Sequence, residues 1–134
     1  MAADERPGCV LVDIDGTIAQ HTGDMKQVFA SPLALLPGTR EIWGEWIRRG
    51  YRVVVTTGRR ESMRAVTAKQ LADAGLQYDQ LVMDCGPGFR ILYNDVKPGD
   101  PRPTAYAVNV ERNKGMLPIE DVLGEREFIP SGRG

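Results

Sequence analysis

The sequence predicts a single Rossmann-like α/β domain with a mainly parallel sheet flanked by helices. Short β-branched apolar runs alternate with stretches in which apolar residues recur at helical spacing, which is the pattern of strand–helix–strand crossover units. The chain has 134 residues, enough for one hydrophobic core. Polar motifs follow three of the predicted strands. Because the carboxyl ends of parallel strands share one edge of a sheet, we expect a ligand site at that edge.

The elements follow one another in the order that crossover units require. The first predicted strand is the apolar run at 9–12. Residues 19–37 contain a glycine and two prolines, so we expect an irregular flap there with one helical turn. A helix is predicted over 39–49, where apolar residues form a stripe and Gly50 marks the end. The stripe comprises Ile42, Trp43, Trp46 and Ile47.

The same alternation continues after Gly50. Residues 52–57 are rich in β-branched side chains and read as a strand, and residues 60–74 read as a helix that ends at Gly75. Further strands are expected at 81–83, 90–93 and 105–110. The domain is expected to occupy residues 1–124, followed by a polar tail at 125–134.

Composition favours a soluble cytoplasmic protein. The net charge is −1, which disfavours a long nucleic-acid partner without excluding one, and no apolar run approaches the length of a membrane span. The polar N-terminus lacks the apolar region of a signal peptide. We expect Cys9 and Cys85 to be buried thiols rather than a disulfide, and one histidine with two cysteines makes no obvious zinc site. The oligomeric state is open, a homo-oligomer included.

Two carboxylates, Asp13 and Asp15, stand one residue apart where the first predicted strand ends. Strand geometry repeats every two residues, so both can start on one side of the backbone, where they repel unless a cation lies between them or one is protonated. A turn in which each Asp bonds its own backbone is the alternative. A calcium loop of the EF-hand type is excluded, because Thr17 and Ile18 stand where a ligand and a glycine are needed.

The segment 13–17, Asp-Ile-Asp-Gly-Thr, resembles the first motif of the haloacid dehalogenase superfamily, DxDGT. The resemblance implies that Asp13 is a nucleophile that becomes phosphorylated, and that Asp15 is the acid and then the base of the two half-reactions. It also places Gly16 and Thr17 against the substrate phosphate. A carboxylate that carries the phosphoryl group as an acyl phosphate divides one difficult displacement into two easier ones.

The end of the second predicted strand resembles the second motif of this superfamily, with Thr57 followed by Gly58 and Arg59. The resemblance implies that the Thr57 hydroxyl and the next backbone amide hold phosphoryl oxygens, and that Gly58 and Arg59 contact substrate. Thr56 competes with Thr57 for this role. Capping of the next helix is the structural alternative.

The string Asn94-Asp95 resembles the acidic fourth motif. The resemblance implies a Mg²⁺ ion held by Asp13, the backbone carbonyl of Asp15, and Asp95, a set of oxygen ligands that suits this ion. An Asn-Asp turn is the alternative reading.

The lysine of the third motif has no clear counterpart, because residues 77–93 contain no lysine. We expect Lys97 to supply the missing positive charge, since it lies two residues beyond Asp95. Arg59 and Arg90 are the alternatives.

The resemblance covers about residues 9–110. The gaps between motifs, 18–52 and 60–80, are too short for a cap domain, so it implies a capless member. The strings at 92–98 and 105–113 are similar to a short bacterial group linked to capsule polysaccharide synthesis, whereas 57–62 is similar to polynucleotide 3′-phosphatases.

The expected function is that of a Mg²⁺-dependent phosphomonoesterase acting on a phosphorylated sugar or another small phosphorylated metabolite. Two alternatives remain, which are a polynucleotide 3′-phosphatase and a non-catalytic binding protein on the same fold.

Overall fold

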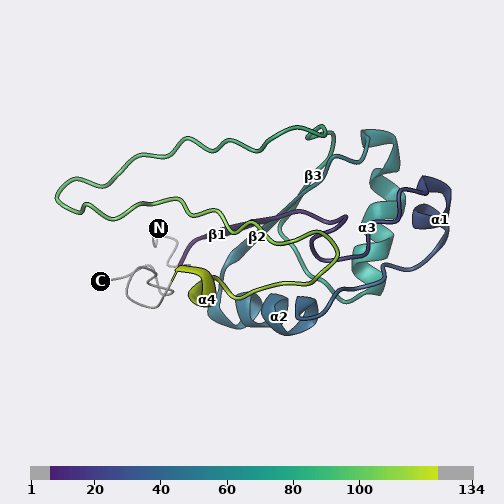
Figure 1. Cartoon of the computed structure of the whole chain (residues 1–134), viewed down its shortest axis with the longest axis horizontal. Helices are drawn as coiled ribbons and strands as arrows, with labels where there is room; N and C mark the ends of the chain where they lie inside the picture. The colour runs from purple at the N-terminus through teal and green to yellow at the C-terminus, as the bar shows by residue number, and fades with distance from the viewer. Residues whose placement is uncertain (1–6, 124–134) are drawn as a thin grey trace, which may run out of the picture.

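The computed structural model describes residues 7–123 and shows an α/β fold around a small parallel sheet (Figure 1). The three strands are β1 (Cys9–Val12), β2 (Arg52–Thr56) and β3 (Gln80–Val82), in the order β1-β2-β3. Both strand pairs are parallel. The α/β class and these three predicted strands are therefore confirmed. The first six residues and the predicted tail at 125–134 lie outside the described residues.

The helices agree with the sequence pattern over most of the chain. They are α1 (Met25–Ala30) in the flap, α2 (Thr39–Arg49), α3 (Arg64–Asp73) after a 3-10 turn (Glu61–Met63), and α4 (Ile119–Leu123). α2 ends at Gly50, whose φ of 81° permits the left-handed cap and whose N–H donates to the carbonyls of Trp46 and Ile47. α4 was not predicted from the sequence. No helix within residues 7–123 has the length and apolar character needed to cross a membrane.

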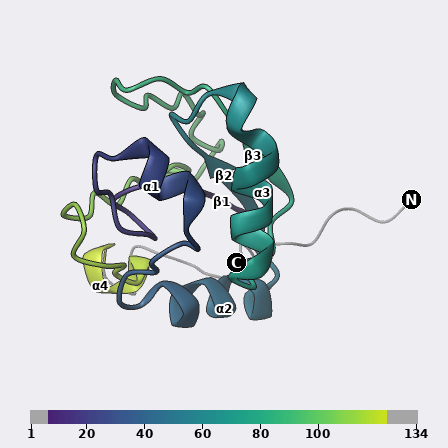
Figure 2. The ribbon, with the colours of Figure 1, turned by 90° about the vertical axis from the view of Figure 1, so that its right-hand side faces the viewer.

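The hydrophobic core lies between one face of the sheet and the helices α2 and α3 (Figure 2). The two crossovers step in the same direction along the sheet, and crossovers are right-handed, so both place their helices on the same face. Trp43 of α2 is 2% exposed, and its Nε1 donates to the carbonyl of Gln77 at 2.8 Å. The core contains Val12, Val53, Val55, Leu71 and Leu81 as well.

The strands predicted at 90–93 and 105–110 do not form. Residues 85–112, which we call the arm, instead leave β3 and return as a two-legged excursion beyond the amino ends of the strands (Figure 1). For 90–93, a parallel strand next to β1 needs a crossover of about a dozen residues, and only 83–89 separate it from β3. The local pattern of 90–93 is that of a strand, but this connection is too short to bring it back in parallel. The segment 105–110 lies on the returning leg and takes no part in the three-stranded sheet.

The expected burial of the cysteines is also wrong. Cys9 is exposed, because it starts an edge strand, and Cys85 is only partly buried at the base of the arm. Neither forms a disulfide.

Candidate active site

The first motif folds as a tight turn directly after β1. The carbonyl of Ile14 accepts hydrogen bonds from the backbone N–H groups of Thr17, Ile18 and Ala19. Ile14 and Ile18 are fully buried and anchor the turn in the core. The alternation of strand geometry then leaves Asp13 and Asp15 half-buried, outside the core, at the carboxyl edge of the sheet.

Asp13 is a carboxylate in a poorly solvated position. Burial raises its pKa above the ordinary value, while a hydrogen bond from the Ile14 N–H and the positive charge of Arg90 lower it in part. The neighbouring Asp15 raises the pKa of Asp13 further, and a hydrogen bond with Thr17 lowers it. A cation or a phosphate with its counter-ion would offset the cost of the Asp13 charge.

Asp15 is held by Arg59 through both carboxylate oxygens. The Nε and Nη2 atoms of Arg59 donate to Oδ2 and Oδ1 of Asp15, each at 2.8 Å. The Arg59 side chain is 1% exposed, and its Nη1 donates to Thr67 Oγ1 at 3.0 Å and Gln70 Oε1 at 2.7 Å. Its guanidinium also lies 5.0 Å from the ring centre of Phe29. Arg59 therefore positions Asp15. Its buried guanidinium does not face solvent, contrary to the prediction that Arg59 contacts substrate.

The hydrogen bonds that hold Arg59 also connect the flap to the aspartate pair. Gln70 of α3, which accepts from Arg59, donates through Nε2 to the carbonyls of Val28 and Ser31 at 2.7 and 2.8 Å. These carbonyls belong to α1 and its end. One buried amide thus connects the flap, α3 and the arginine that holds Asp15.

Thr57 and Gly58 lie in the turn that follows β2, and this turn is hydrogen-bonded to the end of β3. The Thr57 N–H donates to the carbonyl of Val82 at 3.0 Å, and its Oγ1 accepts from the Arg59 N–H at 3.1 Å. A Cβ on Gly58 would lie 3.0 Å from the Gly86 carbonyl oxygen, so any larger residue here would push these two backbone segments slightly apart. Thr57 is buried, whereas Thr56, the last residue of β2, is half-buried. The Thr57 hydroxyl thus closes a local turn and does not cap the next helix, whose N-cap residue makes no side-chain cap bond.

The arm does not bring Asp95 and Lys97 to the aspartate pair. Residues 94–100 form its far end (Figure 1). Asp95 Oδ1 lies 3.7 Å from Lys97 Nζ, with both side chains about two-thirds exposed or more. Of the three cations considered for the missing lysine, Arg59 is committed to Asp15, and Arg90 is the one whose charge reaches Asp13.

Three residues that contact the first or second motif had no role predicted from the sequence. Arg112 packs over the first motif, because a Cβ on Gly16 would lie 3.0 Å from its Cγ, and the Asn113 N–H donates to the Gly16 carbonyl at 2.9 Å. Asp84 follows β3, and its N–H donates to the Arg59 carbonyl at 2.8 Å. Asp84 could have been found as a polar residue after a predicted strand. Arg112 and Asn113 belong to the string 105–113 that resembles the bacterial group, but nothing in that string predicted their contact with the first motif.

The donor set near Asp13 suits a hard cation only in part. Within residues 7–123, no three His, Cys, Asp or Glu side chains come together as a metal site. Both oxygens of Asp15 already accept from Arg59, which leaves the Asp13 carboxylate and backbone carbonyls. Mg²⁺ commonly uses one or two carboxylates and completes its coordination with water and substrate phosphate. The residues therefore fit Mg²⁺ bound through Asp13 together with a phosphate, without a preformed cage.

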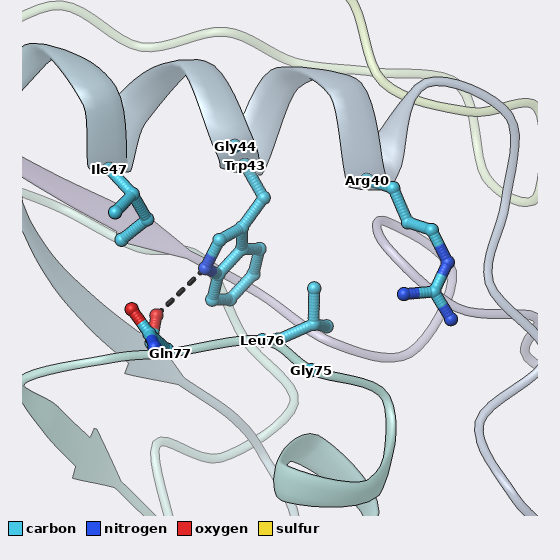
Figure 3. Close-up of a pocket in the computed structure, with 7 residues that line it drawn as sticks. All are labelled: Arg40, Trp43, Gly44, Ile47, Gly75, Leu76 and Gln77. Carbon is cyan, nitrogen blue, oxygen red and sulfur yellow. Dashed lines mark hydrogen bonds between the residues drawn. The ribbon is translucent and has the colours of Figure 1, made fainter.

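A hollow between α2 and the turn at 75–77 lies at the opposite edge of the sheet (Figure 3). Trp43 spans it and reaches the Gln77 carbonyl, with Arg40 at one end. Residues 75–77 lead into the amino end of β3, away from the strand ends that carry Asp13 and Thr57. This hollow contains neither paired carboxylates nor a nucleophile.

Comparison with known proteins gives two structural relatives. No family model matches the sequence, and no curated protein matches it. A chain of the Pnkp1/Rnl/Hen1 complex matches 63% of this chain with 28% identity and a TM-score of 0.52. A chain of the Pnkp1/Rnl/Hen1 RNA repair complex matches 62% with 28% identity and a TM-score of 0.51. This chain covers 30% and 28% of those chains, so it spans less than a third of their length.

Proposed function

We propose that this chain is a phosphomonoester hydrolase that removes phosphate from the 3′ end of an RNA strand through a phosphorylated Asp13. The observation that carries the reaction class is the unequal aspartate pair at the carboxyl end of β1. Asp13 is poorly solvated and has no arginine clamp, whereas Asp15 is fixed through both oxygens by Arg59. A nucleophile and a positioned acid–base group next to it are the two side chains that this chemistry needs.

The substrate class rests on two further observations. The second motif at 57–62 is similar to that of polynucleotide 3′-phosphatases. The two structural relatives come from an RNA repair complex. The net charge of −1 suits recognition of a strand end, which needs few backbone contacts, better than tracking along a polymer. A phosphorylated sugar, the substrate first expected from the sequence, is the second candidate.

In the first half-reaction, a carboxylate oxygen of Asp13 attacks phosphorus and forms an acyl phosphate. The bond between phosphorus and the 3′ oxygen breaks, and the leaving oxygen takes the proton of Asp15. In the second, water attacks phosphorus, Asp15 takes a proton from that water, and the Asp13 carboxylate leaves as inorganic phosphate forms. Arg59 keeps Asp15 aimed throughout, because two hydrogen bonds fix the carboxylate plane.

A Mg²⁺ ion shared by Asp13 and the substrate phosphate would neutralise charge as two anions approach each other. Arg90 lies near Asp13, and Arg112 lies over Gly16. These two arginines are the protein cations best placed to supply the positive charge of the missing third-motif lysine.

A substrate panel tests the proposal. Phosphate release is measured from an RNA oligonucleotide with a 3′-phosphate, its 5′-phosphate isomer, a set of sugar phosphates and an aryl phosphate, each with Mg²⁺ and with excess chelator. We expect the 3′-phosphate with Mg²⁺ to give the highest kcat/KM. Turnover of sugar phosphates alone would overturn the substrate assignment, and no turnover of any substrate would favour a binding protein.

A further inference from the structure

Gln70 of α3 is a buried polar side chain that lies outside the motifs that predicted the site. It is 6% exposed, although glutamine is mostly found at protein surfaces. Its Oε1 accepts from Arg59 Nη1 at 2.7 Å. Its Nε2 donates to the carbonyls of Val28 and Ser31 at 2.7 and 2.8 Å. Both ends of this amide therefore have partners in the interior, one in the site and the others in the flap.

The chemistry of these partners decides which end of the amide faces Arg59. A guanidinium only donates hydrogen bonds, and a backbone carbonyl only accepts them. Turning the amide over would place its NH2 group against Arg59 and its oxygen against two carbonyl oxygens. The flap carbonyls therefore keep the oxygen of Gln70 directed at Arg59.

The direction of the Arg59 guanidinium is set by the partners of its Nη1 atom. This atom donates to Thr67 and Gln70, which leaves the edge with Nε and Nη2 for the two oxygens of Asp15. The group is planar and rigid, so fixing one end directs the opposite edge. The ring of Phe29, which is also in the flap, lies 5.0 Å from the guanidinium. The flap thus contacts Arg59 directly through Phe29 and indirectly through Gln70.

We propose that Gln70 is a positioning residue that aligns Asp15 with the leaving oxygen by joining the flap to Arg59. This role rests on the proposed hydrolase function, in which Asp15 is the acid and then the base. Without Gln70, Arg59 Nη1 loses one of its acceptors, and the guanidinium turns to find another. Asp15 moves with it, because both of its oxygens are bonded to the guanidinium edge. A displacement of about 1 Å at a reacting group can cost roughly 100-fold in rate.

A misaligned Asp15 should impair the steps that transfer a proton through it. The 3′ oxygen of ribose is a strongly basic leaving group and needs a proton as it departs, whereas the oxygen of a nitrophenyl phosphate departs with little acid help. The ratio kcat/KM covers the steps up to phosphorylation of Asp13, so it should fall for the alkyl phosphate and not for the aryl phosphate. The later attack of water uses Asp15 as a base and should be slow with either substrate.

A comparison of two leaving groups tests the role of Gln70. Hydrolysis of a 3′-phosphorylated RNA oligonucleotide and of nitrophenyl phosphate is measured with Mg²⁺ for the unaltered protein and for Gln70→Leu. We expect kcat/KM to fall by roughly 10–100-fold for the oligonucleotide, a part of the roughly 100–10,000-fold that a general acid supplies, and by less than about threefold for the aryl phosphate. A burst of nitrophenol should precede a slower steady rate, because phosphorylated Asp13 accumulates. Gln77→Leu, the same change at an exposed position, should alter neither value.

The ratio of the two kcat/KM values does not depend on how much of the variant is folded, since loss of folded protein lowers both values equally. Gln70→Glu tests the contribution of the flap, because its carboxylate accepts from Arg59 but cannot donate to the carbonyls of Val28 and Ser31. We expect Gln70→Glu to be selectively slow with the oligonucleotide as well. Full activity of this variant would overturn the part given to the flap.

The remaining outcomes separate this role from the proposed function. Equal losses for both substrates in Gln70→Leu would overturn the positioning role and leave the hydrolase function intact. Any alkyl phosphate that the unaltered protein hydrolyses can replace the oligonucleotide, so the comparison does not depend on RNA as the substrate. Turnover of no substrate, or of the aryl phosphate alone, by the unaltered protein would overturn the proposed function and this role together.

Discussion

At the scale of single residues, two aspartates separated by one position have opposite surroundings. Asp13 is half-buried, and that burial raises its pKa. Asp15 shares both oxygens with a buried guanidinium. The difference arises because Arg59 folds inward from the end of β2 and is held there by Thr67 and Gln70 of α3. The environment, rather than the residue type, distinguishes the proposed nucleophile Asp13 from the proposed acid–base group Asp15.

Replacing the proposed nucleophile should abolish turnover without unfolding the protein. We expect Asp13→Asn to lower kcat by roughly 1,000-fold or more, because the amide cannot form the acyl phosphate. Hydrolysis of the 3′-phosphorylated oligonucleotide measures the loss. Asp121→Asn, the same change on exposed α4, should keep full activity. A folded Asp13→Asn protein with unchanged turnover would refute the mechanism.

The raised pKa of Asp13 predicts a pH dependence of stability. A carboxyl whose folded pKa lies above its unfolded value contributes stability below the ordinary value of 3.8, and that contribution is lost as pH rises through the folded pKa. Asp13→Asn should therefore melt at a higher temperature than the unaltered protein at pH 7. The gap should close as pH falls towards 4. Thermal unfolding in chelator-containing buffer measures it, and a variant less stable at every pH would contradict the burial argument.

Removing the Arg59 side chain that holds Asp15 should destabilise the fold. Arg59→Met leaves Asp15 without its partner and frees the polar groups of Thr67 and Gln70 in the interior. Breaking a buried pair from one side costs about 3 kcal/mol or more of unfolding free energy, which urea unfolding can measure. Adding Asp15→Asn should recover part of this loss, since the unpaired charge is then gone. Equal stability of the single and double variants would show that the pair is not coupled.

At the scale of elements, the segment 113–116 closes the flap over the first motif. Asn113 accepts from the His21 N–H at 2.8 Å and donates to the His21 carbonyl at 3.0 Å. The Met116 N–H donates to the Pro37 carbonyl at 2.9 Å. Between them, Gly115 has a φ of 114°, and a Cβ there would lie 2.5 Å from the Pro37 oxygen. The flap is therefore fastened at both of its ends by residues far along the chain.

A methyl group on Gly115 should open this fastening. Gly115→Ala combines an unfavourable φ with a clash against backbone, for an expected cost of about 3 kcal/mol. Gly99→Ala is the matched control, because its φ is 77° with nothing within 4 Å of the new Cβ. It should cost about 1 kcal/mol. Chemical unfolding compares the two, and equal losses would mean that the contact with Pro37 does not matter.

The local sequence pattern correctly predicted the strands whose partner strands follow after a single helical crossover. The runs at 9–12 and 52–57 are followed by helices long enough to return the chain, so β1, β2 and β3 formed as expected. The run at 90–93 has the same local character, but pairing depends on the connection before it, which a local pattern does not contain. Whether a segment forms a strand depends on a partner strand within reach as much as on its own sequence.

The same distinction holds at the candidate site. That Asp13, Asp15 and Thr57 share one edge follows from parallel strands that end together. The inward turn of Arg59 depends on Thr67 and Gln70, and the cover over Gly16 depends on Arg112. These contacts join elements that no spacing in the sequence relates, so the motif alone predicted that Arg59 contacts substrate.

At the scale of the whole molecule, the described core and the arm are separate. All members of the core cluster lie outside residues 85–112. The two ends of the arm contact the body, where Gly86 lies against Gly58 and Arg112 lies over Gly16. Between these ends the side-chain hydrogen bonds are local, such as those of Arg90 with the Gly86 and Gly88 carbonyls and of Asn94 with Thr104. The body should therefore fold without most of the arm.

Replacing residues 89–108 by a flexible Gly/Ser linker of about ten residues should leave a cooperatively folding protein. We expect the unfolding free energy to change by about 1 kcal/mol or less, because no core contact is removed. Thermal and urea unfolding measure this. Trp43→Ala, which empties part of the core, should cost about 3–5 kcal/mol in the same assay. Loss of cooperative unfolding on linker replacement would show that the arm belongs to the folding unit.

The fastening of the flap by Asn113 has a consequence for protein synthesis. Asn113 follows His21 by 92 positions, and ribosomes add about 5–20 residues per second, so it is made roughly 5–20 s later. The nascent chain carries the aspartate pair from the start of that interval and gains Arg59 partway through it. The flap can then make its own backbone bonds and those to Gln70, but not the pair of bonds to Asn113. The candidate site therefore gains this last fastening only after nearly all of the described chain has been translated.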